Sequence, residues 1–379
     1  MPAEKSTVTT QTVLRADHVG SLLRPRELLD TMRASEQGEC SDSKLAEVQD
    51  RCIRDVIRLQ ESIGLQSITD GEYRRRSWIR GFMAALGGFS IKPGKIFFKN
   101  EDGTIRNPMP APYLSRKLKR TKPIVANDYR FISAHTTKRA KVTLPTPSVF
   151  HAGLLDESFD KSVYPDAASF FEDMIAVYHE EIAELGKLGC SFLQLDETQF
   201  PMLCDPQNRE IFRQNGHDPD RLIDTYIEIN NRLISDRPDS MTVGMHLCRG
   251  NASGLFMAAG GYEPVAERLF NNQNVDVYFL EYDSPRAGDF TPLRFVPKGR
   301  IVVLGLVSTK NPEIESEDTL RRRIDEASKY IPVEQLALSP QCGFASSDSS
   351  WNVTQNPMTL DVQKRKLALI VDVADKVWS

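Results

Sequence analysis

Short runs of apolar residues recur along the chain, and most of them end in polar or small residues. Eight runs have the length and composition of β-strands, at 16–21, 65–72, 141–148, 191–197, 242–248, 275–282, 301–307 and 335–342. Between most of them, apolar positions recur at helical spacing, which predicts helices over 43–64, 167–189, 218–236, 263–272, 316–331 and 358–378. Gly64 and Gly189 stand where helix C-caps are expected.

Eight strands alternating with helices predict an α/β protein, a (β/α)8 TIM barrel rather than a doubly wound sheet. No G-x-G-x-x-G or P-loop motif follows an early strand, which disfavours a nucleotide-binding fold. Residues 88–135 interrupt the alternation, because GKIFFKNEDGTIRNP predicts a β-hairpin that turns at EDG, before a Pro-rich basic loop. We interpret them as an insertion in a single domain of residues 1–379, and we expect residues 1–12 to be disordered.

Composition excludes several classes of protein. The net charge of −4 gives no basic field for nucleic acid, and the basic runs at 74–76, 115–122 and 321–323 are interpreted as solvated faces. No apolar stretch approaches the ~20 residues of a membrane span, and the N-terminus lacks the apolar segment of a signal peptide. The six cysteines are widely spaced, which indicates free thiols and a cytoplasmic location.

Candidate chemistry gathers at the predicted strand ends, which surround the active site in a barrel. His246 and Cys248 end the fifth strand, where residues i and i+2 point to the same side. Alone, this pair is compatible with buried packing. Glu281 at the end of the sixth strand and Cys342 at the end of the eighth complete a set of Zn²⁺-type ligands. The remaining cysteines are interpreted as structural: Cys40, Cys52, Cys190 and Cys204.

Six motifs occur in order along the chain: HVGSLLRP, ITDGEYRRRSW, LQLDE, HLCRGN, FLEYD and SPQCGF. From about residue 13 to 355, the chain resembles the catalytic half of cobalamin-independent methionine synthase, and still more closely its short single-barrel relatives. The resemblance implies a TIM barrel and a Zn²⁺ ion bound by His246, Cys248, Glu281 and Cys342. It also implies contacts to homocysteine or methionine from Val19, Gly20, Ser21, Glu72 and Asp196.

A sulfur-rich ligand set favours alkyl transfer to a thiol, because anionic ligands keep a metal-bound thiolate nucleophilic. Hydrolytic zinc sites more often use neutral histidines. The expected activity is methyl transfer to homocysteine, in methionine biosynthesis. Glu72 and Asp196 would hold the ammonium group, and N–H groups near Gly20 and Ser21 the carboxylate. The other interpretations are a surface ion pair of Glu72 with Arg74–Arg76 and a helix N-cap at Asp196.

The methyl-donor half departs from the family pattern. Ser308, in LGLVSTKNPE, stands roughly where the family has a histidine that protonates the departing folate nitrogen, and a serine is no general acid near neutral pH. His151, in TLPTPSVFHAG, stands at or near the family's pterin-stacking tryptophan. It either takes over the acid role or caps the next helix. Because the family's folate-binding half is missing, the donor is left open between methyl-tetrahydrofolate, a simpler methyl compound and a protein-bound methyl group.

Three other functions stay open. One is epoxide opening by a zinc-bound thiolate, as in the similar epoxyalkane:coenzyme M transferase; the others are a barrel with structural zinc and a zinc hydrolase. Carboxylates at Glu72 and Asp196 favour an amino-acid thiol over a sulfonate thiol, which would need cations there. A homo-oligomer is compatible with the sequence, which leaves the oligomeric state open, as it does what the insertion covers.

Overall fold

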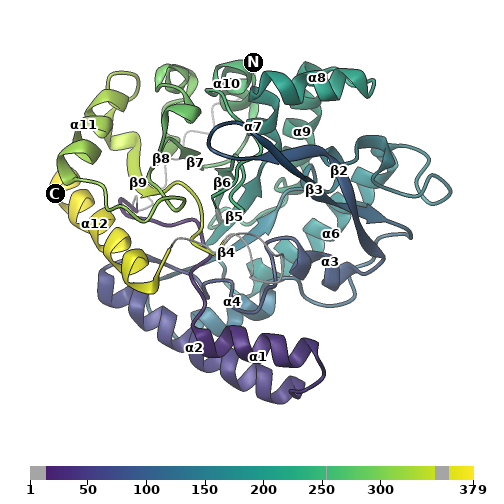
Figure 1. The fold of residues 1–379 in the computed structure, drawn as a ribbon, viewed down its shortest axis with the longest axis horizontal. Coiled ribbons are helices and arrows are strands. Elements are labelled where there is room, and N and C mark those ends of the chain that lie inside the picture. Colours follow the sequence, from purple (N-terminus) through teal and green to yellow (C-terminus); the bar gives the residue numbers. More distant parts are fainter. Residues whose placement is uncertain (1–13, 253, 346–357) are drawn as a thin grey trace.

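Seven parallel strands form one curled sheet in a computed structural model, which describes residues 14–252, 254–345 and 358–379. The order across the sheet is β1-β4-β5-β6-β7-β8-β9, so its strands are neighbours in the order in which they occur along the chain (Figure 1). The strands span Ser67–Ile68 (β1), Arg139–Pro145 (β4), Phe192–Glu197 (β5), Thr242–Leu247 (β6), Val277–Glu281 (β7), Ile301–Val307 (β8) and Leu336–Pro340 (β9).

Helices alternate with these strands and surround the sheet (Figure 1). They are α1 (Arg26–Glu36), α2 (Asp42–Ile63), α3 (Arg80–Leu86), α4 (Ala126–Ser133), α5 (Val149–Ala152), α6 (Ala167–Lys187), α7 (Gln199–Cys204), α8 (Pro206–Gln214), α9 (Pro219–Leu233), α10 (Glu263–Asn272), α11 (Glu317–Ala327) and α12 (Leu360–Trp378). The predicted α/β TIM-barrel class is confirmed, and the six helices predicted from periodicity are α2, α6, α9, α10, α11 and α12.

Local signals set the helix ends. The Ser41 side chain accepts a hydrogen bond from the Lys44 N–H at the start of α2, and Ser316 does the same for Thr319 at α11. Caps of this kind stabilise a helix by about 1 kcal/mol. Gly64 ends α2 in the left-handed region, with φ of 101°, as predicted.

The first predicted strand is reduced to one β-bridge, between Ala16 and Leu338 of β9. After this bridge, the carbonyl groups of residues 18–20 accept hydrogen bonds from side chains instead of from the backbone of a neighbouring strand. The Lys141 ammonium donates to the His18 carbonyl, Gln194 Nε2 to Val19 O (2.6 Å), and Thr69 Oγ1 to Gly20 O (2.8 Å). These bonds satisfy the carbonyl groups of the HVG segment and hold it across the inside of the barrel.

The inside of the barrel combines an apolar base with one buried ion pair. Phe192, Phe279, Val303 and Ala337 form a separate core cluster, and Gly244 leaves space for the two rings. The fully buried Lys141 Nζ lies 2.7 Å from Asp17 Oδ1 and 4.8 Å from the centroid of the Phe279 ring. An ion pair in this setting must keep both partners, because a buried charge left alone is costly.

The predicted hairpin is β2 (Phe89–Lys99) and β3 (Ile105–Leu114), which turns at the predicted EDG with Gly103 at φ of 83°. It lies over the barrel in Figure 1, and the backbone of Lys99 bonds that of Phe256 in both directions. The Lys99 ammonium lies 2.9 Å from Asp205 Oδ2, a buried pair that fixes the hairpin to the loop before α8. The hairpin is therefore bound to the barrel near its tip.

The rest of the 88–135 segment rejoins the barrel. Helix α4 packs against β4 and α6, as a barrel helix does. The single-domain interpretation stays a prediction, and residues 1–12, expected to be disordered, lie outside the described residues. In the described part of the chain, no helix combines the length and the apolar character that crossing a bilayer requires.

Replacing Lys141 by methionine should leave the buried Asp17 carboxylate without its ion-pair partner. We expect Lys141→Met to lower the free energy of unfolding by about 3–5 kcal/mol, measured by urea denaturation. Lys117→Met, at an exposed position, is the control. The double variant Asp17→Asn/Lys141→Met should be more stable than Lys141→Met; equal or lower stability would contradict the ion-pair account.

Candidate metal centre and substrate pocket

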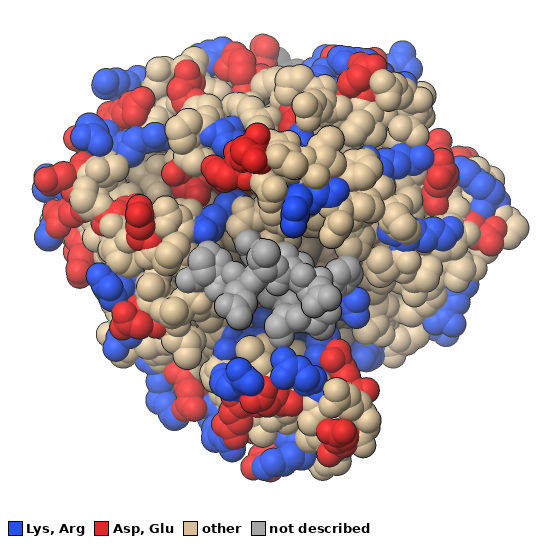
Figure 2. Space-filling model, viewed as in Figure 1, with Lys and Arg blue, Asp and Glu red and all other residues tan. Residues whose placement is uncertain are grey.

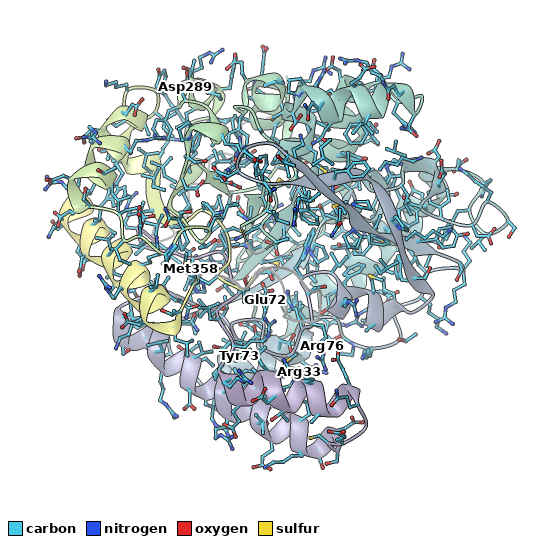
Figure 3. The ribbon with its side chains drawn as sticks, viewed as in Figure 1. Arg33, Glu72, Tyr73, Arg76, Asp289 and Met358 are labelled. Carbon is cyan, nitrogen blue, oxygen red and sulfur yellow. The ribbon has the colours of Figure 1, made fainter. Side chains whose placement is uncertain are left out.

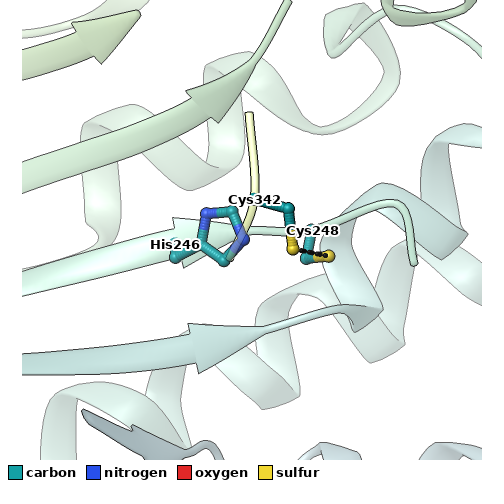
Figure 4. A group of neighbouring side chains, drawn as sticks. All are labelled: His246, Cys248 and Cys342. Carbon is teal, nitrogen blue, oxygen red and sulfur yellow. Dashed lines mark hydrogen bonds between the residues drawn. The ribbon is translucent and has the colours of Figure 1, made fainter. Parts of the chain in front are cut away.

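Three side chains converge at the carboxyl ends of β6 and β9. His246 lies in β6, Cys248 follows that strand directly, and Cys342 follows β9. Their ligand atoms all lie within 4.8 Å of one another, and the two sulfur atoms are 3.4 Å apart (Figure 4). All three residues are buried. The structure thus brings together three of the four sequence-predicted metal ligands.

The cluster has the chemistry of a metal-binding site. Neither ring nitrogen of His246 has a hydrogen-bond partner among the described residues, which is costly for a buried imidazole. The Cys342 thiol lowers the pKa of Cys248 well below its usual range by hydrogen bonding, and the same contact, with burial, raises the pKa of Cys342. A divalent cation that accepts nitrogen and sulfur, such as Zn²⁺, fits these three donors.

Glu281 ends β7 beside this cluster, fully buried, but its carboxylate is already held by cations. Oε1 lies 3.3 Å from Lys310 Nζ and 3.4 Å from Arg286 Nη2, while Oε2 accepts the Arg249 N–H at 3.0 Å. Burial would raise the pKa of Glu281, but these positive charges outweigh it and lower the pKa to about 2. Glu281 is therefore ionised, and a metal would have to compete with Lys310 and Arg286 for Oε1.

The loop RGN after β6 turns two consecutive N–H groups toward these anions. The Arg249 N–H donates to Glu281, and the Gly250 N–H donates to Cys248 Sγ at 3.3 Å. Gly250 has φ of 89°, and a Cβ there would lie 2.9 Å from the Met257 side chain. Glycine is thus required at this position by both the backbone conformation and the packing.

A small cavity of about 120 Å³ adjoins the cluster and is lined by its three residues together with Glu72 and Asp196. Asp196 is the register partner of His246 in the pairing of β5 with β6. Burial raises the pKa of Asp196 to about 7, and the nearby Glu72 carboxylate adds to the rise. Two carboxylates at one small cavity create a site for a cation, such as the ammonium group of an amino acid.

Glu72 lies in the turn after β1 in a conformation unusual for its residue type, with φ of 61°. Such a backbone costs about 1–3 kcal/mol, and the surroundings must hold it in place. The Asp70 side chain accepts the Glu72 N–H at 2.8 Å, and Thr143 Oγ1 donates to Glu72 Oε1 at 3.1 Å. In Figure 3, Glu72 lies near the middle of the view, while Tyr73 and Arg76 lie further toward α1.

The HVGS segment completes this cavity. Val19 and Ser21 line it, and a Cβ on Gly20 would lie 3.0 Å from Glu72 Oε1. Ser21 also constrains the residue after Cys342, since a Cβ at Gly343 would lie 2.0 Å from Ser21 Oγ. The glycines of HVGS and SPQCGF therefore allow the two loops to approach each other beside the cluster.

The alternative interpretations of the two carboxylates are met only in part. Glu72 does pair with one residue of the run 74–76, since Arg75 Nη1 lies 3.7 Å from Glu72 Oε1, but both side chains are buried and the pair is not on the surface. The start of α7 is bound by Glu197, whose Oε1 accepts the Gln199 N–H, and not by Asp196. Arg75 also corrects the interpretation of 74–76 as a solvated face: it donates to Thr143 Oγ1 and O from within the protein.

The two candidate acids are directed elsewhere. His151 Nδ1 lies 2.9 Å from the Tyr226 hydroxyl, and its Nε2 lies 3.6 Å from Asp156. Burial lowers the pKa of His151. The residue is the third of the four residues of α5 and is not the cap of a helix. The Ser308 hydroxyl accepts the Lys310 N–H at 3.2 Å. Neither residue is among those that line the cavity beside the cluster, within the described part of the chain.

Several residues of the site were not predicted from the sequence. Lys310 and Arg286 hold Glu281, while Trp78, Phe98 and Met257 line the cavity. Trp78 lies in the motif RRRSW and Lys310 in STKNPE, but the residue type alone does not tell which other side chains they contact. Phe98 comes from the hairpin, far from the cluster in sequence.

Together, the curled parallel sheet and the His-Cys-Cys cluster at its strand ends define an α/β-barrel protein with a sulfur-rich candidate metal centre and a carboxylate-lined pocket beside it. The chain belongs to the cobalamin-independent methionine synthase family, because the family described as "Cobalamin-independent synthase, Catalytic domain" matches residues 15–365. The resemblance found in the motifs is thereby confirmed.

Individual relatives agree with this assignment. The protein YxjH of Bacillus subtilis, itself described as uncharacterized, is 37% identical and is aligned over 96% of this chain and 94% of its own. A methionine synthase of Pyrococcus abyssi is 26% identical, over 89% of this chain and 88% of its own. The crystal structure of a putative vitamin-B12-independent methionine synthase from Listeria monocytogenes superposes with a TM-score of 0.74 and 31% identity, covering 96% and 98% of the two chains.

Removing one sulfur donor should abolish metal binding without unfolding the barrel. We expect purified protein to contain about one zinc per chain, since three donors converge at one point, and Cys342→Ala to lose it, measured by elemental analysis after dialysis. Cys204→Ala is the matched control, because Cys204 is also buried but donates only to the Phe200 carbonyl. Circular dichroism checks folding, and full zinc retention in Cys342→Ala would overturn the assignment.

Proposed function

We propose that this protein is a zinc-dependent S-methyltransferase that makes methionine from homocysteine. The observation that carries the proposal is the position of the His246, Cys248 and Cys342 donors directly beside a pocket with two carboxylates. Family membership supports the same reaction class. His246, Cys248 and Cys342 would hold the ion. Glu281 would be the fourth ligand if the ion displaced Lys310 from its carboxylate. A thiol bound in the pocket would then lie next to the ion.

Zinc held by two thiolates would lower the pKa of an incoming thiol and leave it nucleophilic. The chain's own residues then orient the substrate. Glu72 and Asp196 bind the ammonium group, and the N–H groups near Gly20 and Ser21 bind the carboxylate. The thiol proton leaves to solvent, the sulfur–methyl bond forms as the donor–methyl bond breaks, and the donor fragment keeps the electron pair.

An amino-acid thiol fits the pocket better than a sulfonate thiol. No lysine or arginine is among the described residues that line this pocket, whereas Glu72 and Asp196 are. A sulfonate would be repelled by these carboxylates at the distances a cavity of about 120 Å³ allows. Epoxide opening with a sulfonate thiol, the alternative from the sequence, is therefore disfavoured.

His151 and Ser308 transfer no proton in this reaction. The His151 ring is packed against Phe171, with ring centroids 5.2 Å apart, and its Nδ1 is bound to Tyr226. In this proposal the protein is a single barrel domain that acts in the cytoplasm. Its small-molecule partners are homocysteine and a methyl donor.

Methionine formation tests the proposal directly. Purified, zinc-loaded protein is incubated with homocysteine and a panel of donors: methyl-tetrahydrofolate, S-methylmethionine, glycine betaine and methylcobalamin. We expect methionine from at least one donor, and Glu72→Gln to raise the KM for homocysteine about 10- to 100-fold, the cost of losing one charged hydrogen bond. The control is Glu228→Gln, an exposed helix residue. No methionine from any donor, or an unchanged KM in Glu72→Gln, would refute the proposal.

Titration of the variants tests the roles of His151 and Ser308. Because neither side chain lines the pocket, His151→Gln and Ser308→Ala should keep the pH profile of kcat, measured between pH 5 and about 9, where histidine is the usual acid. Loss of one limb of the profile in His151→Gln would show that the imidazole moves into the site during turnover.

A further inference from the structure

Two histidines and an aspartate form a second group of metal-type donors, the His-Asp-His group. It consists of His151 in α5, Asp156 in the short 3-10 helix η1 (Leu155–Glu157) and His217 between α8 and α9. The Asp156 carboxylate contacts both imidazoles: its Oδ1 lies 3.6 Å from His151 Nε2, and its Oδ2 lies 3.8 Å from His217 Nε2. Imidazole and carboxylate are donor types that Zn²⁺ accepts in proteins. None of the three is among the described residues that line the substrate pocket.

The distances within this group are too long for hydrogen bonds. A hydrogen bond between an imidazole N–H and a carboxylate spans about 2.7–3.2 Å. Two ligands of one tetrahedral zinc ion, each about 2.0–2.1 Å from the metal, lie about 3.3 Å from each other. The separations of 3.6 and 3.8 Å in the group therefore have to shorten only slightly for each imidazole to share an ion with the carboxylate.

The His151 ring is held with one nitrogen directed at Asp156. Its Nδ1 lies 2.9 Å from the Tyr226 hydroxyl, while Nε2 is buried and has no hydrogen-bond partner among the described residues. A histidine that binds a metal usually donates its other ring N–H to a second partner, which Tyr226 provides. In that tautomer the Nε2 lone pair faces a carboxylate, and a cation between the two removes the repulsion. Burial also lowers the pKa of His151, which keeps the ring neutral, as metal binding requires.

The backbone next to Asp156 has an unusual conformation. Leu155 lies in the left-handed region, with φ of 55°, which is rare for a large side chain. Such conformations persist only where the surroundings hold them, and they are frequent at ligand-binding segments. The Leu155 side chain is buried, and the Ser158 hydroxyl donates to the His151 carbonyl at 2.7 Å, which connects the end of η1 to α5. The backbone of Asp156 is thus fixed beside His151.

An ion can reach the group from solvent. The Asp156 side chain is 55% exposed and that of His217 is 20% exposed, whereas that of His151 is 3% exposed. The centroids of the two imidazole rings are 6.1 Å apart, so His217 has to move toward His151 for both to bind one ion. In Figure 2, acidic and basic side chains are interspersed over the visible face, so the affinity has to come from the donors and not from a field of one sign. It should be weaker than that of the His-Cys-Cys cluster, whose donors lie closer together.

We propose that His151, Asp156 and His217 form a second binding site, for a divalent cation of the zinc type. The two Nε2 atoms and one Asp156 oxygen bind the ion, and water completes its coordination, because the group offers three donors. Tyr226 orients the His151 ring from outside the site. The bound ion connects α5 and η1 to the segment between α8 and α9, and it stabilises the folded chain by mass action. The site is independent of the proposed methyl transfer.

Titration of dialysed protein with Zn²⁺ tests the site by calorimetry, without any turnover. We expect the parent protein to bind one further, weaker ion per chain. His217→Ala and Asp156→Asn should each weaken this binding at least about tenfold, and Tyr226→Phe, which removes only the outer partner of the imidazole, about 10- to 100-fold. The matched control is His179→Ala, because His179 Nδ1 also faces a carboxylate, that of Asp236, at 3.8 Å. This variant should bind the second ion as the parent does.

Thermal unfolding gives an independent measurement. Excess Zn²⁺ should raise the Tm of the parent and of His179→Ala, and should raise it less in His217→Ala and Asp156→Asn. Both of these variants alter partly exposed side chains, and circular dichroism checks that they fold. The proposal is overturned if the parent binds no second ion, if His217→Ala binds it as tightly as the parent, or if His179→Ala weakens it equally.

Discussion

Parallel pairing of β5 with β6 is the constraint on which the rest of the site depends. Because Asp196 and His246 are register partners, the carboxylate that lines the substrate pocket and the imidazole of the cluster occupy adjacent positions at one edge of the sheet. Slipping one of the two strands by one residue would turn its side chain to the other face of the sheet, so that the two groups would no longer lie side by side. The substrate pocket and the candidate metal centre are thus fixed by the same set of backbone hydrogen bonds.

Burial then determines which charges can coexist at this edge. Glu281 stays ionised because Lys310, Arg249 and Arg286 surround it, whereas Asp196, without an equivalent set of cations, has its pKa raised to about 7. Arg286 also pairs with Glu101 at the tip of the hairpin, 3.0 Å away. One arginine therefore connects the charge balance of the cluster to the element that covers the barrel.

The sequence predicted the fold class well, because apolar runs and helical spacing are local patterns, and it identified the donors that converge at the strand ends. It could not predict that residues 16–21 form a single bridge, because the bonds that replace the ladder come from Lys141, Gln194 and Thr69, distant in sequence. It could not predict that Arg75 is buried within a basic run, since burial depends on what packs above it. The alternating prolines in NPMPAP are visible in the sequence, but the cavity of about 570 Å³ that they line exists only because the hairpin packs over the barrel.

Those prolines have a consequence for the solubility of the chain. A two-stranded hairpin exposes two edges, and unpaired edge strands can recruit strands of other molecules and lead to aggregation. Proline has no N–H to offer such a partner, and Pro93 of β2 is the register partner of Pro110 of β3, so both edges are interrupted at the same level. The hairpin can thereby extend over the barrel without offering a second molecule an uninterrupted strand edge.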